Sequence, residues 1–295
     1  MLVTGATGFI GRAAVTELVN HGWDVHAVGR SPGAREGVQV YAVDLRDPTA
    51  TRLLLRTVVP SHLLHFAWYA EPGKFWTAPE NLDWVAASLF LYRAFLDVGG
   101  RRAVFAGSCA EYDWSYSHLH ETCTPTRPRT LYGRAKNVLR ELIEAHAQLI
   151  GAELAWGRVF FLYGPGEAPN RLLSDLITAL TEGRPALCTH GRQQRDFMHV
   201  ADAARAFVRV LESGFCGPIN IASGVCRPVA DAVAIVARLL GRPELVRFGA
   251  REPQPDDPPR LAADVAKLSR LGFRPDFDLE TGLARTVGSW CQTRG

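Results

Sequence analysis

The sequence has no apolar run long enough to cross a membrane. A spanning helix needs about 18 apolar residues, and the longest candidate, residues 84–92, is half that length. No basic stretch precedes the first apolar residues, so no signal peptide is expected. Neither sign of charge dominates, because 33 Lys and Arg stand against 30 Asp and Glu, and no basic block favours nucleic-acid binding. These absences predict a soluble cytoplasmic protein that binds neither membranes nor nucleic acid.

The cysteines and histidines give no metal signature. No two of the six cysteines form a CxxC pair, and we find no metal-ligand spacing among the nine histidines. We therefore expect free thiols in a reducing compartment and predict no metal site. With 47% hydrophobic and 21% charged residues, the composition is that of an ordinary globular protein.

Apolar segments alternate with segments of helical periodicity along the first half of the chain. The expected strands are 2–3, 23–28, 38–43, 62–67, 102–106 and 153–161, and the expected helices are 12–20, 48–59, 81–98 and 131–150. This alternation predicts an α/β fold with a parallel sheet covered by helices on both faces. Further helices are expected at 172–181, 201–212, 263–270 and 279–290, and 249–259 is expected to be a surface loop.

Three glycines lie directly between the first strand and the first helix, in the run VTGATGFIG. A dinucleotide site needs one glycine for the tight turn, one for close approach of the pyrophosphate and one for packing of the helix on the strand. Gly5, Gly8 and Gly11 fit these needs, and the following helix would direct its N-terminus at the negative charge. The motif therefore predicts a Rossmann-type doubly wound sheet that binds a dinucleotide.

Further motifs follow in order along nearly the whole chain. They are DLRD at 44–47, HFA at 65–67, YGRAK at 132–136, YGPG at 163–166 and RDFMHV at 195–200. With the glycine run, they resemble the NAD(P)-dependent epimerase/dehydratase family, the nucleotide-sugar-modifying branch of the extended short-chain dehydrogenases/reductases. The resemblance implies that Asp44 and Leu45 border the adenine and that Ala67 lines the cofactor path. Other candidate cofactor contacts are Thr7, Phe9, Ile10, Phe66, Trp68, Tyr132 and Lys136.

The division of the chain follows from these motifs. We expect residues 1–164, joined again by 192–223, to form the dinucleotide-binding domain. Residues 165–191 and 224–295 are expected to form a smaller substrate-binding lobe.

The end of the second expected strand bears on the choice of cofactor. NAD enzymes carry a carboxylate there for the ribose 2′-hydroxyl, whereas this chain has Arg30 and Ser31. An arginine can pair with a 2′-phosphate, so we predict a preference for NADP(H). NAD(H) remains the alternative, with Arg30 as a solvated loop residue.

The predicted catalytic groups are a phenol, an amine and a hydroxyl. Tyr132 and Lys136 lie four residues apart and so share one helix face. A nearby ammonium would lower the pKa of the phenol toward the range for proton transfer. Ser108 ends the fifth expected strand, where active-site groups of open α/β sheets gather, and would orient the substrate oxygen.

The residues after Ser108 help to choose the reaction. Family 4,6-dehydratases carry an Asp-Glu pair there, and enzymes that resemble GDP-fucose synthase carry a cysteine two residues later. This chain has Cys109 and Ala110, and Glu111 stands one position late. Dehydration and 3,5-epimerisation are thus disfavoured. The prediction is NADPH-dependent reduction of a 4-keto nucleotide-linked (deoxy)sugar, and the alternative is an NAD-dependent nucleotide-sugar 4-epimerase.

The substrate is expected to be a nucleoside-diphosphate sugar, held by arginines that bind phosphate oxygens bidentately. Candidate substrate contacts are Ser108, Glu111, Tyr112, Phe161, Arg171, Arg195 and Arg251, with solvated surface arginines as the alternative reading. Phe161 stands where many relatives have a diphosphate-binding asparagine. The aromatic stretch 68–76 could wall off a sugar or simply pack in the core.

Two further readings concern regulation and assembly. A non-catalytic NADP-sensing regulator on this fold would not need the serine, tyrosine and lysine, all of which are present. By analogy with the family, we expect a homodimer that pairs helices 81–98 and 131–150 as a four-helix bundle.

Overall fold

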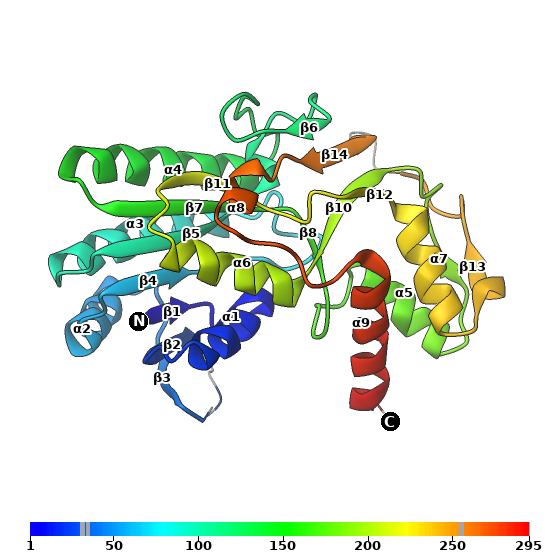
Figure 1. Cartoon of the computed structure of the whole chain (residues 1–295), viewed down its shortest axis with the longest axis horizontal. Coiled ribbons are helices and arrows are strands. Elements are labelled where there is room, and N and C mark those ends of the chain that lie inside the picture. Colours follow the sequence, from blue (N-terminus) through cyan, green and yellow to red (C-terminus); the bar gives the residue numbers. More distant parts are fainter. Residues whose placement is uncertain (30–32, 34–35, 254–256, 295) are drawn as a thin grey trace.

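The computed structural model describes residues 1–29, 33, 36–253 and 257–294. Seven parallel strands form its larger sheet, in the order β11-β7-β5-β4-β1-β2-β3 (Figure 1). Their bounds are β1 Leu2–Thr4, β2 Val25–Gly29, β3 Val38–Ala42, β4 His62–His65, β5 Arg102–Ser108, β7 Glu153–Val159 and β11 Gly217–Ile221. This doubly wound order confirms the predicted α/β, Rossmann-type fold.

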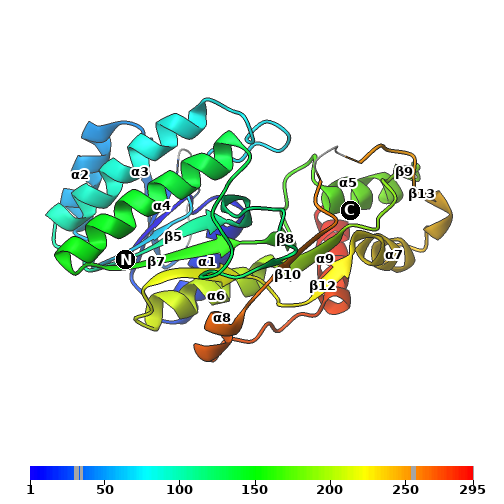
Figure 2. The same ribbon diagram turned by 90° about the horizontal axis from the view of Figure 1, so that it is seen from above.

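Helices cover both faces of this sheet (Figure 2). Helices α2 (Pro48–Val58), α3 (Glu80–Asp97) and α4 (Leu131–Ile150) lie on one face, and α1 (Phe9–Asn20) and α6 (Val200–Glu212) lie on the other. Neighbouring strand residues alternate between the two cores, as the pleat requires. Leu2 and Phe105 pack with α2, α3 and α4, whereas Val3 and Val104 pack with α1 and α6.

A second, mixed sheet lies beyond the carboxyl ends of the large sheet (Figure 1). Its order is β12-β10-β14-β6, and β8 also pairs with β10. The bounds are β6 His118–Leu119, β8 Phe161–Tyr163, β10 Gln194–His199, β12 Cys226–Pro228 and β14 Arg260–Ala263. Helices α5 (Leu172–Thr181), α7 (Val229–Leu239) and α9 (Leu279–Arg294) share a third core. The remaining elements are η1 Cys109–Glu111, β9 Ala186–Leu187, η2 Pro243–Leu245, β13 Val246–Arg247 and α8 Ala266–Arg270.

The second sheet is the main difference from the sequence prediction. Its strands have two to six residues, and β10 begins with the polar run Gln-Arg-Asp, so they carry no apolar alternation to recognise. The expected strand 153–161 is also divided, because Phe160 separates β7 from β8 and turns the chain from one sheet to the other. The proposed boundaries between the domain and the lobe stay a prediction.

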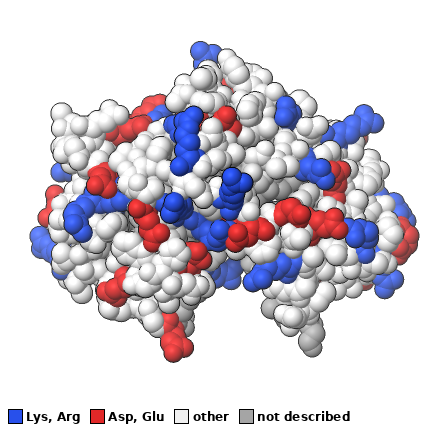
Figure 3. Space-filling model, in the orientation of Figure 1, with Lys and Arg blue, Asp and Glu red and all other residues white. Residues whose placement is uncertain are grey.

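No helix among the described residues has the length and apolar character needed to span a bilayer. On the face shown in Figure 3, basic and acidic side chains are interspersed, and no patch of one sign covers it.

Candidate active site

The three glycines of the first loop occupy three different environments. Gly5 has φ +64°, and a Cβ there would lie 2.7 Å from the backbone nitrogen of Ala67. A Cβ on Gly11 would lie 2.1 Å from the Gly5 carbonyl oxygen, so α1 can pack on the turn only without a side chain. At Gly8, by contrast, a Cβ would meet only the Gly5 carbonyl, at 3.1 Å. Gly5 thus permits the tight turn, and Gly11 permits α1 to pack on that turn. Gly8 leaves open the space through which a ligand would approach the backbone.

Helix α1 begins beside this open approach without a capping side chain. Its N-cap is Gly8, and no side-chain hydrogen bond caps the first turn. The first amides of a helix lack partners within the helix and carry partial positive charge. Phe9 and Ile10 are half-buried in this turn, and Thr7 is exposed just before it. The β1–α1 junction can therefore hold a pyrophosphate, the group that the sequence motif predicts there.

The neighbouring strand ends place the other candidate cofactor contacts. Asp44 is half-buried and accepts hydrogen bonds from the Arg46 side chain, at 2.6 Å and 3.0 Å, while the side chain of Leu45 is buried. Ala67 lies against Gly5, and the preceding Phe66 packs at 4.9 Å on Phe207 of α6. Arg30 and Ser31, on which the NADP(H) preference depends, lie outside the described residues.

Ser108, Tyr132 and Lys136 are brought together at this same edge. Ser108 is the last residue of β5, and Tyr132 lies in the first turn of α4, whose N-cap Thr130 accepts from the Gly133 amide at 3.1 Å. The Tyr132 and Ser108 hydroxyls are hydrogen-bonded. Lys136 follows one turn later and donates to the Ala106 carbonyl at 2.9 Å. Ser108 on β5 and Tyr132 on α4 are distant in the sequence, and the fold brings them close together.

The charges at this edge differ from the sequence expectation. Burial raises the pKa of Tyr132, although its hydrogen bond to Ser108 and the positive charge of Arg171 act to lower it. Burial lowers the pKa of Lys136 to about 7, against the opposing effect of Glu111. The prediction that Lys136 lowers the pKa of Tyr132 is wrong for this structure, because its ammonium faces the Ala106 carbonyl and the Trp68 ring.

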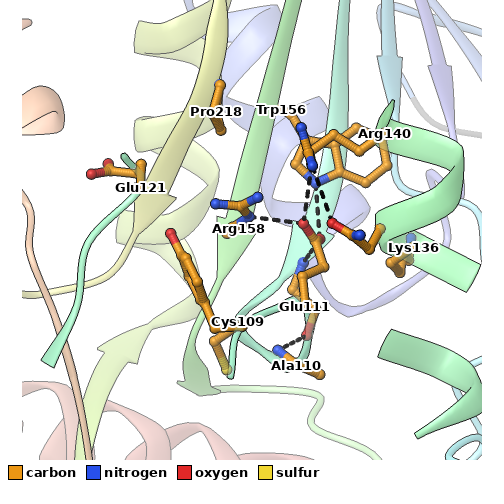
Figure 4. A network of polar contacts seen from close by, with 12 residues as sticks. Cys109, Ala110, Glu111, Glu121, Lys136, Arg140, Trp156, Arg158 and Pro218 are labelled. Atoms are coloured by element: carbon orange, nitrogen blue, oxygen red, sulfur yellow. Dashed lines mark hydrogen bonds and ion pairs between the residues drawn. The ribbon is translucent and has the colours of Figure 1, made fainter. Parts of the chain in front are cut away.

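Glu111 lies in the interior of the protein, with its carboxylate directed toward Trp156 and Arg158 (Figure 4). It is fully buried, and its carboxylate accepts from the Ser108 amide at 2.7 Å, from Trp156 Nε1 at 2.9 Å and from Arg158 Nε at 2.8 Å. The prediction that Glu111 contacts substrate is therefore wrong, since its oxygens are used within the protein. Sequence reasoning did not place Trp156 and Arg158 beside Glu111, because the three lie together only through the pairing of β7 with β5.

Tyr112 is likewise buried and is not available to a substrate. Only 1% of it is exposed, its hydroxyl donates to Asn220 at 2.7 Å, and its ring lies 4.4 Å from the Arg158 guanidinium. The prediction of substrate contact at Tyr112 is thus also wrong. Burial further raises the pKa of the neighbouring Cys109 thiol to about 12, which makes it a poor nucleophile.

The aromatic stretch 68–76 packs around Tyr132. Ring centroids of Phe75, Trp76 and Trp68 lie 4.9, 5.8 and 6.4 Å from that of Tyr132. The Tyr132 amide also donates to the Trp76 carbonyl at 3.1 Å. Trp68 additionally covers Lys136, with Nζ 3.7 Å from its ring centroid. These rings therefore wall one side of the Tyr132 phenol.

The candidate phosphate-binding arginines lie in three places. Arg171, just before α5, has its guanidinium 5.3 Å from the Phe75 ring, on the Tyr132 side of the molecule. Arg195 is buried, pairs with Asp257 and lies 5.3 Å from the Phe161 ring. Arg251 is exposed, and its amide donates to the carbonyl of Cys188, which directly follows β9. The structure thus brings Arg171 close to Phe75 and Tyr132 and joins Arg195 with Phe161. Among the described residues, no contact joins Arg251 to either pair.

The comparisons agree with this geometry. The family model described as "NAD dependent epimerase/dehydratase family" matches residues 1–222. The solved structure of MoeE5 in complex with UDP-glucuronic acid and NAD is 34% identical, covers 99% of both chains and has a TM-score of 0.87. The UDP-glucose 4-epimerase of Thermus thermophilus, solved with NAD, is 26% identical over 98% of both chains, with a TM-score of 0.87. A dTDP-4-dehydro-6-deoxy-D-allose reductase from a Streptomyces species is 27% identical, over 97% of this chain and 94% of its own.

Proposed function

Because the chain belongs to the NAD-dependent epimerase/dehydratase family, we propose that it is a nucleotide-sugar 4-epimerase that acts on a UDP-linked hexose or hexuronic acid with NAD. The observation that carries the proposal is the assembly of Ser108, Tyr132 and Lys136 at the end of β5. Among the described residues beside Ser108, the other acid–base groups, Glu111 and Cys109, are buried. Such a site supports redox chemistry at one carbon and disfavours dehydration.

The residues fit a bound dinucleotide. Gly8 leaves open space in front of the uncapped α1 N-terminus, where the backbone amides would hold a pyrophosphate. Bound NAD would supply a hydride acceptor and later return the hydride, so that a single carbon is oxidised and then reduced. The complex of MoeE5 with UDP-glucuronic acid and NAD supports this choice of cofactor and substrate class.

The side chains of this protein account for the proton transfers. Tyr132, as the phenolate, would take the proton of the sugar C4 hydroxyl as C4 is oxidised, and the resulting phenol would give this proton back when C4 is reduced from the other face. Ser108 donates a hydrogen bond to the same oxygen and holds it in place. The aromatic wall of Phe75, Trp76 and Trp68 restricts access of water to the phenol.

The second candidate is the NADPH-dependent 4-ketoreductase that the sequence favoured. Arg30 in the sequence and the Streptomyces reductase among the relatives support it. The raised pKa of Tyr132 also favours a phenol that is ready to protonate a reduced carbonyl. Both candidates use the same three residues, and they differ in the cofactor and in whether hydride returns to the substrate.

One assay separates the two candidates. The protein is incubated with UDP-glucuronic acid or UDP-glucose and NAD, and the C4 epimer is measured by chromatography and proton NMR. An epimerase forms the epimer with no net change in absorbance at 340 nm. If the protein instead consumes NADPH in proportion to an added dTDP-4-keto sugar and forms no epimer, the epimerase proposal is wrong. In either assay, Tyr132→Phe is expected to lower kcat by roughly 10²–10⁴, and Tyr116→Phe, an exposed control, should leave it unchanged.

A further inference from the structure

One cluster of metal-ligating side chains lies outside the site described above. His120, Glu121 and Asp264 each offer a donor atom, and the three donors all lie within 4.8 Å of one another. Sequence spacing did not indicate this cluster, because Asp264 belongs to a distant part of the chain. It is brought close by the parallel pairing of β14 with β6.

The strand register explains why two of these side chains converge. Ala262 pairs with His118, Ala263 pairs with Leu119, and the Asp264 amide continues the ladder by donating to the Leu119 carbonyl at 3.0 Å. Asp264 thus stands opposite His120 one step beyond the paired residues. Side chains at the same register position of adjacent strands lie on the same face of a sheet, so the imidazole and the carboxylate lie side by side.

Glu121 supplies an independent sign of a missing partner. It is 7% exposed, and its Oε1 accepts from the Asn220 amide at 2.9 Å. Its Oε2 has no hydrogen-bond partner among the described residues. The carboxylate points away from Arg158 (Figure 4). Lys267, in α8, donates to the Pro218 carbonyl instead. A buried carboxylate oxygen without a partner is costly, and a cation would satisfy it.

The remaining donors are also compatible with a bound ion. His120 Nδ1 also lies 3.0 Å from Thr122 Oγ1. In the tautomer in which Nδ1–H donates to this hydroxyl, the ring is held in place and Nε2 keeps a lone pair for a metal ion. Asp264 Oδ1 accepts from the Ala266 amide at 2.9 Å, which orients the carboxylate. Both side chains are half-buried, so water can complete the coordination. Three donors bound to one metal ion at about 2.0–2.2 Å lie about 3.3–3.8 Å apart. The donors here, which lie within 4.8 Å of one another, would therefore close by up to about 1 Å on binding.

We propose that His120, Glu121 and Asp264 form a binding site for one divalent transition-metal ion, such as Zn²⁺ or Mn²⁺. One imidazole with two carboxylates suits such ions, whereas Mg²⁺ and Ca²⁺ prefer oxygen donors alone. The ion would join the segment after β6, which lies between Ser108 and Tyr132 in the chain, to β14 of the second sheet. It lies apart from the reacting groups, so its role would be to hold these two segments together.

Metal binding is tested directly on the whole protein after dialysis against EDTA. Mn²⁺ is titrated in, and free Mn²⁺ is counted by electron paramagnetic resonance. We expect one equivalent to bind, Zn²⁺ to displace it, and the unfolding midpoint to rise by about 5 °C at a hundredfold excess over Kd. Glu121→Gln and Asp264→Asn should each weaken Kd at least tenfold, whereas His190→Ala, which removes a histidine elsewhere on the surface, should leave Kd unchanged.

A measurement on the parent protein covers the case in which a variant does not fold. Electron spin echo modulation of bound Mn²⁺ should show one imidazole nitrogen, and His120→Ala should abolish it. The proposal is overturned if the parent takes up no stoichiometric ion at 1 mM, if no nitrogen is coupled, or if folded Glu121→Gln binds as tightly as the parent. Since none of these measurements depends on turnover, the outcome is independent of the proposed epimerase activity.

Discussion

Replacing Glu111 by glutamine is expected to destabilise the protein strongly. The parent carboxylate accepts from the Ser108 amide, from Trp156 and from Arg158, and both it and Arg158 are buried. A glutamine oxygen can still accept from Ser108 and Trp156. Its amide group, however, would face the Arg158 Nε–H, so that two donors oppose each other and the guanidinium loses its charge partner.

The size of the effect follows from the exposure of Arg158. Only 1% of this residue is exposed, and removal of one partner of a buried ion pair costs about 3–5 kcal/mol. Urea unfolding followed by circular dichroism should therefore show a loss of this size in the free energy of unfolding. Glu141→Gln makes the same change of charge at a half-exposed ion pair and should cost less than about 1 kcal/mol.

A second variant distinguishes the loss of charge pairing from a general loss of packing. In Glu111→Gln/Arg158→Met the unpaired charge is gone, and apolar replacements of buried ion pairs are often neutral. The double variant should therefore be more stable than Glu111→Gln alone, by at least about 1 kcal/mol. If Glu111→Gln unfolds within about 1 kcal/mol of the parent, or if the double variant is the less stable of the two, the pairing does not stabilise this region as argued.

Four further substitutions test other parts of the molecule. Gly8→Ala places a methyl group in the space in front of the α1 N-terminus and should weaken NAD binding at least tenfold with little loss of stability. Gly11→Ala should instead prevent α1 from packing on the Gly5 turn. Calorimetric titration measures the binding, and thermal unfolding measures the stability. Trp68→Leu removes the ring over Lys136 Nζ, a contact worth about 0.5–2 kcal/mol to the charged form, so the pKa of Lys136 should fall below its value of about 7. In the pH profile of kcat/KM, the part of the curve that reflects ionisation of Lys136 should then move to lower pH. If it does not move, the Trp68 ring does not stabilise the charged form of Lys136. Leu142→Asp, on the exposed apolar face of α4, should convert the proposed homodimer to a monomer by light scattering; a monomeric parent would refute that interface.

Much of the fold was predictable because its signals are local in the chain. Gly5, Gly8 and Gly11 lie within one loop, and their spacing alone indicates a turn that cannot carry side chains. Tyr132 and Lys136 share one helix face because they are four residues apart. The larger sheet follows from apolar segments long enough to show their period. Each of these features depends on residues that are neighbours in the sequence.

The side chains of Glu111 and Lys136 were harder to place, because their environment depends on other elements. Glu111 was expected to face a substrate, but the chain turns at η1 directly after β5 and directs its carboxylate under the strand toward Arg158 of β7. Lys136 was expected to act on the Tyr132 phenol, but the Ala106 carbonyl holds its ammonium. The sequence thus predicted where each residue lies along the chain's strands and helices. The direction of each side chain depends on a partner on another element, Arg158 for Glu111 and the Ala106 carbonyl for Lys136.

The same reasoning explains why the cluster around Glu121 has no trace in the sequence. His120 and Glu121 follow a two-residue strand, and Asp264 reaches them only because β14 pairs with that strand in one register. A shift of one residue in this pairing would turn Asp264 to the opposite face. Asn220 then fixes the arrangement, since its amide nitrogen donates to the carbonyls of Leu119 and Asp264, each at 2.9 Å. The register of β14 against β6 thus determines whether the three side chains meet, and this register is visible only in a structure. None of the three residues belongs to the motifs that identify the family, so they can change without any change in those motifs.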